Sequence, residues 1–129
     1  MPNDPTRELS DRRILVVEDE RLIALDIRDI LEEWGCVVLG PVATAAAALE
    51  LVANDRPDCA VLDVQLASGT SEPIAAVLRA DGCPFLILTA YQRGHLTGAL
   101  QDAPMLSKPV DETKLRQALM SLLPANMSR

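Results

Sequence analysis

The chain has 129 residues, of which 49% are hydrophobic and 2% aromatic, and its formal net charge is −7. This length suits one domain with a core of Leu, Val, Ile and Ala. The negative charge argues against non-specific binding to nucleic acid or to anionic membranes, because both need clusters of Lys and Arg. The acidity would equally well serve solubility alone.

The sequence predicts neither a membrane-spanning or secreted protein nor a metal site made of cysteines. No apolar stretch approaches the roughly 20 residues that a membrane span needs, and residues 1–13 lack the apolar core of a signal peptide. The cysteines Cys36, Cys59 and Cys83 lack metal-ligand spacing and fall in or beside predicted strands. We interpret them as small buried side chains in a reducing cytoplasm, with a redox role as the less favoured alternative.

The first half of the chain alternates between apolar runs and amphipathic stretches. Residues 1–11 contain two prolines and few apolar residues, so we expect a flexible leader. The pattern then predicts a strand at 13–17, a helix at 20–34, a strand at 36–39 and a helix at 44–54. Gly35 suits the end of the first helix, Gly40-Pro41 would close the second strand, and Thr44 can cap the second helix.

The second half continues this alternation. The pattern predicts a strand at 59–62, a loop at 64–71, a helix at 72–80, a strand at 85–88, a helix at 91–101, a strand at 105–107 and a last helix capped by Asp111. Pro73 stands in the first turn of its helix, where proline is tolerated. The stretch 91–101 is the least helical, because Gly94 and Gly98 both lower helix propensity.

Five strand–helix alternations predict a three-layer α/β sandwich with a parallel sheet. The expected limits are a flexible leader at 1–11, one folded domain at 12–124 and a tail at 125–129. No internal repeat and no linker to a second domain is visible in the sequence.

Charged residues follow three of the apolar runs. The triplet Glu18-Asp19-Glu20 ends the first strand, Asp63 ends the third, and Lys108 follows the fifth. Since ligand sites of parallel sheets form at the carboxyl ends of the strands, these side chains are expected to gather in one crevice. Two sets of carboxylates and a lysine are the components of a magnesium-assisted, phosphoryl-accepting site.

Each of these residues also has a simpler explanation. The acidic triplet could favour the following helix by its charge, Asp63 could form a turn, and Lys108 could make a stabilising salt bridge. Taken together, carboxylates held close need a cation, and Mg²⁺ prefers such oxygen ligands. Lys108 is one of only two lysines in the chain, and an ammonium there can pair with a carboxylate at rest and with a phosphoryl oxygen later.

Four motifs now stand in order at successive strand ends. They are Val-Val-Glu-Asp-Glu at 16–20, Leu-Asp-Val around Asp63, Leu-Thr-Ala around Thr89, and Lys108-Pro109. This pattern resembles the receiver domain of two-component response regulators, over residues 14–123. The resemblance implies a flavodoxin-like (βα)5 sandwich with five parallel strands in the order 2-1-3-4-5.

The resemblance also implies the acceptor chemistry. Asp63 would be the phosphoacceptor, and Thr89 and Lys108 would bind the phosphoryl oxygens. A carboxylate is a competent nucleophile toward phosphohistidine once a metal and a lysine neutralise the developing charge. The aspartyl phosphate then hydrolyses slowly, and Thr89 and Lys108 couple its presence to a change at the surface.

The implied cofactor is Mg²⁺ or Mn²⁺. By the resemblance, Asp19 would be its direct ligand, with Glu18 as the supporting acid. Asp63 and the backbone carbonyl of Gln65 would complete the set of protein ligands.

The chain departs from the family pattern at the switch positions. Receivers usually carry an aromatic residue three positions before the lysine, where this chain has Met105. An aromatic stands instead at Tyr91, two positions after Thr89. Residues 85–91 resemble a single-domain subgroup with a Phe-x-x-x-Thr-Gly-Tyr signature, although Ala90 replaces the glycine.

These departures suggest a hypothesis about Tyr91. It would replace the missing aromatic and gate the surface of the fourth helix, fifth strand and fifth helix. In the alternative, Tyr91 only covers the crevice and slows hydrolysis. Gly94 and Gly98 suggest that this region becomes ordered only after phosphorylation or metal binding.

The function predicted from the sequence is that of a stand-alone receiver. A histidine kinase or a phosphotransfer protein would donate the phosphoryl group, and an unknown downstream protein would bind the result. It would be a cytoplasmic signalling domain rather than an enzyme, a monomer or weak dimer with no nucleic-acid or membrane partner. The rivals are a phosphorylation-independent interaction domain on the same fold and a small phosphatase or phosphotransferase.

Overall fold

The computed structural model describes residues 9–67, 69–90, 98–101 and 103–123. Its centre is a parallel sheet made of β1 (Arg13–Val17), β2 (Val37–Val42), β3 (Cys59–Asp63), β6 (Phe85–Thr89) and β7 (Met105–Ser107). These five strands lie side by side in the order β2-β1-β3-β6-β7. Counted along the chain within this sheet, the order is 2-1-3-4-5, so the predicted topology is confirmed.

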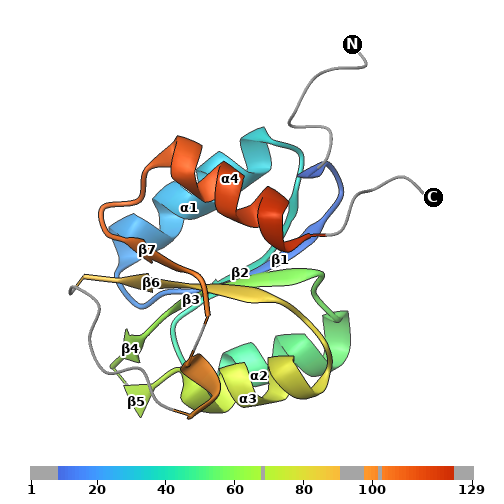
Figure 1. Cartoon of the computed structure of the whole chain (residues 1–129), viewed down its shortest axis with the longest axis vertical. Helices are drawn as coiled ribbons and strands as arrows, with labels where there is room; N and C mark the ends of the chain where they lie inside the picture. Colours follow the sequence, from blue (N-terminus) through green and yellow to red (C-terminus); the bar gives the residue numbers. More distant parts are fainter. Residues whose placement is uncertain (1–8, 68, 91–97, 102, 124–129) are drawn as a thin grey trace.

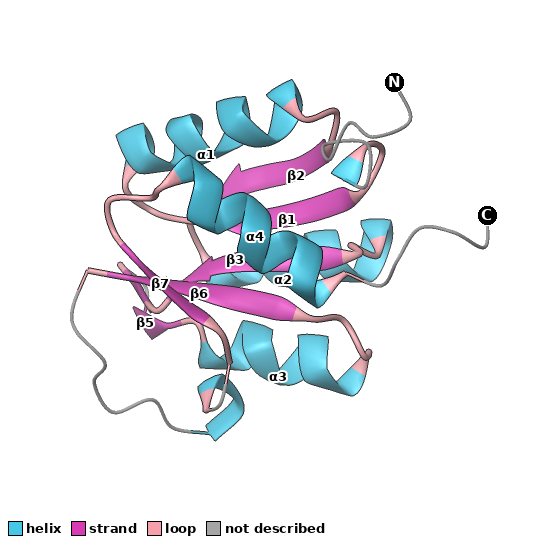
Figure 2. Cartoon of the chain, turned by 45° about the horizontal axis from the view of Figure 1, so that its top comes forward, coloured by secondary structure: helices cyan, strands magenta, loops and turns pink. Residues whose placement is uncertain are grey.

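Helices cover both faces of the sheet. α1 (Arg21–Glu33) and α4 (Glu112–Leu122) lie on one face, and α2 (Ala45–Asp55) and α3 (Glu72–Ala80) lie on the other (Figure 1). Figure 2 shows α4 crossing in front of the strands. The predicted three-layer α/β sandwich is confirmed. Within the described ranges, none of the helices combines the length and the apolar character that crossing a bilayer requires.

Each strand supplies side chains to two separate cores, because successive residues of a strand point to opposite faces. Ile14 and Val16 of β1 pack with α1 and α4, whereas Leu15 and Val17 pack with α2 and α3. All four side chains are completely buried. Burying one such side chain contributes about 2 kcal/mol, so a strand covered on both faces must be apolar at nearly every position.

Two predicted helix caps are present. Thr44 Oγ1 accepts a hydrogen bond from Ala47 N at 3.2 Å at the start of α2. Asp111 Oδ1 accepts one from Lys114 N at 3.0 Å at the start of α4. A cap of this kind contributes about 1 kcal/mol, because it satisfies a backbone N–H that the helix itself leaves unpaired.

Three expectations from the sequence need correction. β2 does not close at Gly40-Pro41 but continues through these residues to Val42. Leu9, assigned to the flexible leader, is completely buried in the core under α1 and α4. The expected loop 64–71 contains a small antiparallel hairpin, in which β4 (Gln65–Leu66) pairs with β5 (Gly69–Thr70).

The end of the predicted helix at 91–101 also differs from the prediction. Residues 91–97 lie outside the described residues. The following turn, η2 (Gly98–Leu100), is a 3-10 helix rather than an α-helix. Gly98 has a φ of +57°, and the side chain of Glu72 occupies the space beside it that a Cβ would need.

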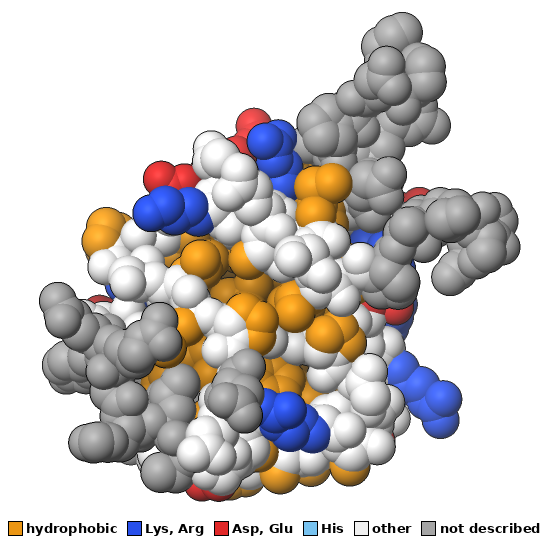
Figure 3. All heavy atoms as spheres, viewed as in Figure 1, with side chains coloured by type: hydrophobic (Ala, Val, Ile, Leu, Met, Phe, Trp, Pro, Cys, Tyr) orange, Lys and Arg blue, Asp and Glu red, His pale blue; other side chains and the backbone are white. Residues whose placement is uncertain are grey.

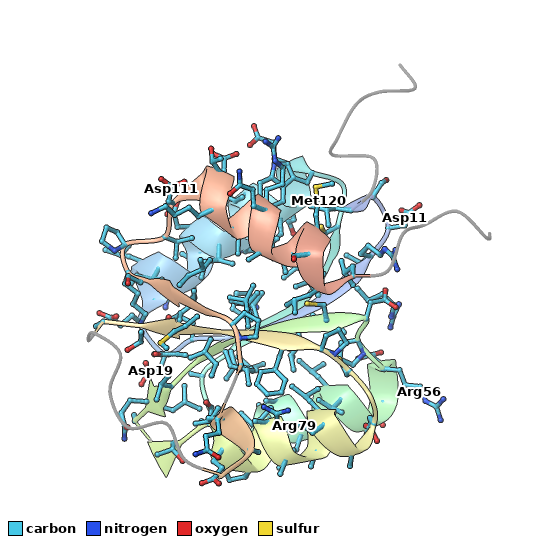
Figure 4. All side chains as sticks on the ribbon, in the orientation of Figure 1. Asp11, Asp19, Arg56, Arg79, Asp111 and Met120 are labelled. Carbon is cyan, nitrogen blue, oxygen red and sulfur yellow. The ribbon has the colours of Figure 1, made fainter. Side chains whose placement is uncertain are left out.

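Two side chains of α3 hold the segment 98–101 in place. Glu72 Oε2 accepts a hydrogen bond from Ala99 N at 3.2 Å. Arg79 donates through Nε to Ala99 O and through Nη2 to Gln101 O, both at 2.6 Å, while its guanidinium lies 5.2 Å from the centre of the Phe85 ring (Figure 4). We call these two residues the α3 clamp.

Candidate functional site

The register of the sheet brings the predicted acidic residues together. Val17 of β1 pairs with Leu62 of β3, so the next residues along the two strands, Glu18 and Asp63, are neighbours at the carboxyl edge. Both are buried, with 2% and 5% of their surface exposed. The geometry therefore places two carboxylates side by side, as the sequence predicts.

Lys108 approaches the same two carboxylates from the end of β7, which lies on the opposite flank of β3 from β1 in the sheet. Thr89 of β6 pairs with Ser107 of β7, and Lys108 N donates to Thr89 O at 2.9 Å. The Lys108 ammonium Nζ lies 3.0 Å from Glu18 Oε1 and 3.2 Å from Asp63 Oδ2. Only 8% of the lysine side chain is exposed, so these are close contacts in a largely dehydrated site.

Glu18 is the most constrained of the acids. Its Oε2 accepts a hydrogen bond from Glu20 N at 3.0 Å. Its Oε1 faces the ammonium of Lys108 as an ion pair, but no donor of the described residues meets this buried oxygen with hydrogen-bond geometry. Burial, with a smaller contribution from the charge of Asp63, raises the pKa of Glu18 even though the Glu20 amide and the ammonium oppose the shift.

The pKa of Lys108 shows that its pairing outweighs its burial. Burial alone would lower the pKa of an ammonium, since it disfavours the charged form. The contacts with Glu18 and Asp63, and the negative charges of both, reverse this effect and raise the pKa of Lys108 above its ordinary value. The lysine is therefore a fixed positive charge at any physiological pH.

Asp19 completes the acidic group from a partly exposed position. Its Oδ2 accepts a hydrogen bond from Ala67 N at 2.6 Å, which ties it to the β4–β5 hairpin. One carboxylate oxygen from each of Glu18, Asp19 and Asp63 lies within 4.8 Å of the others. Figure 4 places Asp19 close to β4, at the carboxyl edge.

These donors fit a small divalent cation. Carboxylate oxygens are the ligands that Mg²⁺ prefers, and a magnesium ion is commonly held by one or two of them together with waters and a phosphate. Glu18 Oε1 is a buried anionic oxygen that lacks a directed hydrogen bond within the described residues, as a site built for an additional cation would leave it. When bound, such an ion would offset the repulsion among the three carboxylates.

Comparison with known proteins decides the family. A model of the response regulator receiver domain matches residues 14–120. The chain belongs to the response regulator receiver family. This confirms the resemblance inferred from the four strand-end motifs.

This receiver has relatives of known structure. It is 31% identical over 114 residues to the Phyllosphere-induced regulator PhyR of Methylorubrum extorquens, an alignment that covers 85% of this chain and 43% of PhyR. The chain thus spans less than half the length of PhyR and of several other curated relatives. A solution structure of SdrG from Sphingomonas melonis Fr1 matches with a TM-score of 0.76 and 37% identity, and covers 87% of this chain and 96% of SdrG.

A second solution structure shows SdrG from Pseudomonas melonis Fr1 in its BeF3-activated conformation. It matches this receiver with a TM-score of 0.75 and 36% identity. The match covers 89% of this chain and 98% of that one.

The remaining predicted site residues do not all lie beside the acidic group and Lys108. Thr89 is buried at the end of β6, directly beside the lysine strand. Gln65 is exposed at the start of β4, and its role as a carbonyl ligand stays a prediction. Met105 pairs with Ile87 and packs into the core under α2 and α3 rather than at the site. Tyr91 lies outside the described residues, so its hypothesis stays a prediction.

Two contacts of the site were not foreseen from the sequence. Lys108 Nζ also lies 3.2 Å from Glu20 Oε1, and Ala67 N holds Asp19. A signal for the first was available, because alternate residues of an extended segment point the same way and Glu20 precedes α1 in extended conformation. The second depends on the hairpin, whose two-residue strands leave too short a pattern to recognise.

Proposed function

We propose that the receiver accepts a phosphoryl group on Asp63 from a phosphohistidine of a histidine kinase or phosphotransfer protein. One observation carries this proposal. Asp63 Oδ2 lies 3.2 Å from Lys108 Nζ, and a second oxygen set, from Glu18 and Asp19, stands within 4.8 Å of the same carboxylate. A nucleophile, a fixed cation and a set of metal donors therefore meet at one point.

The proposed transfer is a simple displacement at phosphorus. A carboxylate oxygen of Asp63 forms a bond to phosphorus while the bond to the imidazole nitrogen breaks, and its electron pair returns to the ring. The products are an acyl phosphate and a neutral histidine, which forms when the ring nitrogen that lost the phosphoryl group takes up a proton from solvent. Hydrolysis then transfers the phosphoryl group to water and restores the carboxylate.

The chain's own residues supply most of the charge control for this step. Lys108, already within 3.2 Å of Asp63, would pair with an oxygen of the arriving group, and Thr89 at the end of β6 would offer its hydroxyl to another. Mg²⁺ held by Asp19, Asp63 and Glu18, with the carbonyl of Gln65, would supply further neutralisation of negative charge.

We further propose that phosphorylation changes the surface of the fourth helix predicted at 91–101, of β7 and of α4; residues 91–97 of this surface lie outside the described residues. Hydrophobic side chains are grouped on the face where β7 and α4 lie, which suits a protein partner (Figure 3). The BeF3-activated conformation of SdrG supports a conformational response in a relative. Thr89, Tyr91 and Met105 remain the predicted switch residues.

The test is incubation with acetyl phosphate and Mg²⁺ followed by intact-mass measurement. We expect one added phosphoryl group, which is lost in Asp63→Asn and when the divalent ion is chelated. Asp26→Asn is the matched control, because it removes the same charge from an exposed position on α1. An adduct that persists in Asp63→Asn, or none in the wild type, would contradict the proposal.

The same experiment separates the rival functions. No adduct together with retained binding to a partner would favour the phosphorylation-independent interaction domain. Sustained turnover of a separate phosphoester would favour a phosphatase or phosphotransferase.

A further inference from the structure

The ammonium of Lys108 faces three carboxylate oxygens in the resting site, and the one that accepts a directed hydrogen bond from it is Glu20 Oε1. A lysine ammonium carries three N–H groups and no acceptor. Three carboxylate oxygens surround it, from Glu18 at 3.0 Å and from Asp63 and Glu20 at 3.2 Å each. A phosphoryl oxygen can therefore gain the N–H that points at Glu20 only when Glu20 releases it.

The three carboxylates differ in the free energy that is needed to separate them from the ammonium. The side chains of Glu18 and Asp63 are 0% and 8% exposed, so releasing either leaves a dehydrated carboxylate without a counter-charge. The side chain of Glu20 is 61% exposed, so water replaces the ammonium at little cost. Of the three carboxylates, Glu20 is therefore the one that separates from Lys108 at the lowest cost in free energy.

Only the side chain of Glu20 needs to move. Its backbone is held on both sides, because Glu20 N donates to Glu18 Oε2 at 3.0 Å and Glu20 O accepts from Ala24 N at 2.9 Å. The residue is the N-cap of α1, but its side chain makes no capping hydrogen bond. Rotation of that side chain away from Lys108 leaves the helix start intact.

We propose that Glu20 is a positioning residue that acts through Lys108. It occupies one N–H of the ammonium at rest and is displaced when the phosphoryl group arrives at Asp63. This role rests on the proposed function, since it assigns Glu20 a part in the same transfer. Glu20 aims the ammonium in the resting protein and, as an anion beside the entry point, slows the approach of a phosphodonor.

The proposal predicts the effect of removing the charge. Glu20→Gln keeps the size of the side chain and its backbone, but no longer repels the donor or competes at full strength for Lys108. We expect phosphoryl uptake from acetyl phosphate to rise about two- to fivefold at low ionic strength, the range typical of one exposed ion pair. The gain should shrink at 0.5 M salt, because exposed charges are screened there.

The chain offers controls for both parts of this prediction. Glu33→Gln makes the same charge change at the exposed far end of α1 and should leave uptake unchanged. Lys108 and Lys114 are the two lysines of the chain, and Lys114 is exposed on α4. Labelling with an amine-reactive reagent, read peptide by peptide, therefore compares the site lysine with an internal reference and needs no phosphodonor.

Glu20→Gln and Glu20→Ala should each raise the labelling of Lys108 relative to Lys114 by about twofold or more, since the neutral amine is the reactive form and loss of this carboxylate favours release of a proton from the ammonium. Unchanged labelling in both variants would overturn the proposal, and so would faster labelling with unchanged or slower phosphoryl uptake. A phosphoryl adduct that forms equally fast in wild type and both variants would overturn the role of Glu20 alone. No adduct in any of the proteins would overturn the proposed function, and the role of Glu20 with it.

Discussion

At the amino edge of the sheet, where the strands begin, Arg13 pairs with the carboxylate of Asp55, whereas at the carboxyl edge several carboxylates share one ammonium. Arg13 Nη2 lies 3.6 Å from Asp55 Oδ1, and Asp58 Oδ2 accepts from Arg13 N at 2.8 Å. At the carboxyl edge, four carboxylates and the ammonium of Lys108 form one group with an excess of three negative charges. The four are those of Glu18, Asp19, Glu20 and Asp63.

The charged residues that line a hollow at the amino edge add to this contrast. A hollow of about 670 Å³ lies at the amino edge, and the charged residues that line it are two arginines and two aspartates. They are Arg12, Arg56, Asp58 and Asp81. The hollow at the amino edge is thus lined by equal numbers of arginines and aspartates, while the described residues of the carboxyl edge carry an excess of carboxylates. Local charge imbalance, rather than the size of a cavity, identifies the chemical end of this fold.

The largest expected effect comes from removing the ammonium of Lys108 from the carboxyl edge. Lys108→Met leaves Glu18 and Asp63 buried without a counter-charge and should lower the free energy of unfolding by about 3 kcal/mol at pH 7. Urea denaturation measures this loss. Lys114→Met, at an exposed site, should change stability by less than about 0.5 kcal/mol.

The loss in Lys108→Met should also depend on pH. Burial raises the pKa of Glu18 above its ordinary value of 4.5, so the folded protein binds this proton more tightly than the unfolded chain does. Stability therefore rises as the pH falls from 7 toward 4.5, and part of the loss is recovered. A loss that grows on acidification would contradict this account of the site.

The α3 clamp gives the next largest effect, because it holds the segment that runs between the two edges. Gly98 and Gly82 both have positive φ, +57° and +72°, but only Gly98 has Glu72 where a Cβ would go. Gly82→Ala should cost about 1 kcal/mol in strain. Gly98→Ala should cost about 2 kcal/mol, since it also displaces Glu72 from Ala99 N. Equal losses in denaturation of the two variants would show that the Glu72 contact contributes nothing.

Divalent ions should stabilise the carboxyl edge alone. Mg²⁺ at ten times its dissociation constant should add about 1.4 kcal/mol to the free energy of unfolding, because it binds only the folded site. Asp19→Asn should lose most of this gain, although its amide oxygen can still accept from Ala67 N. Asp58→Asn, the matched change at the amino edge, should keep the gain. Equal behaviour of the two variants in thermal unfolding would contradict the assigned metal donors.

The last prediction concerns the reactivity of a thiol at the amino edge and involves no change in the free energy of unfolding. Burial, with the charges of Asp58 and Asp81, raises the pKa of Cys83 to about 11. Its alkylation in the native protein should therefore speed up about tenfold per pH unit from pH 8 to 10, because the thiolate is the reactive form. An ordinary thiol, such as glutathione, levels off above about pH 9. A native rate at Cys83 that levels off there, or that changes with Mg²⁺, would contradict the separation of the two edges.

The fold and the main site residues were predictable for a physical reason. Strands covered on both faces must be apolar, so the charged residue that ends such a run, as Asp63 does, marks the sheet edge. Thr44 and Asp111 mark helix starts equally directly, since capping is a local interaction.

The remaining features depend on contacts between distant parts of the chain. Asp19 and Ala67 are 48 positions apart, and Arg79 and Ala99 are 20 apart, so no local pattern announces either pair. The β4–β5 hairpin and the η2 turn are too short for hydrophobic periodicity to show. Leu9 was missed because one buried leucine in a polar segment carries no periodic signal.

The most direct test of the central claim is a structure of the receiver with Mg²⁺ and beryllofluoride, a non-hydrolysed mimic of the phosphoryl group. The account predicts beryllium bonded to a carboxylate oxygen of Asp63, a fluorine in contact with Lys108 Nζ, and the metal on Asp19. Beryllofluoride bound elsewhere, or Asp63 left free at saturating concentration, would contradict the claim that these residues form one phosphoryl-accepting site.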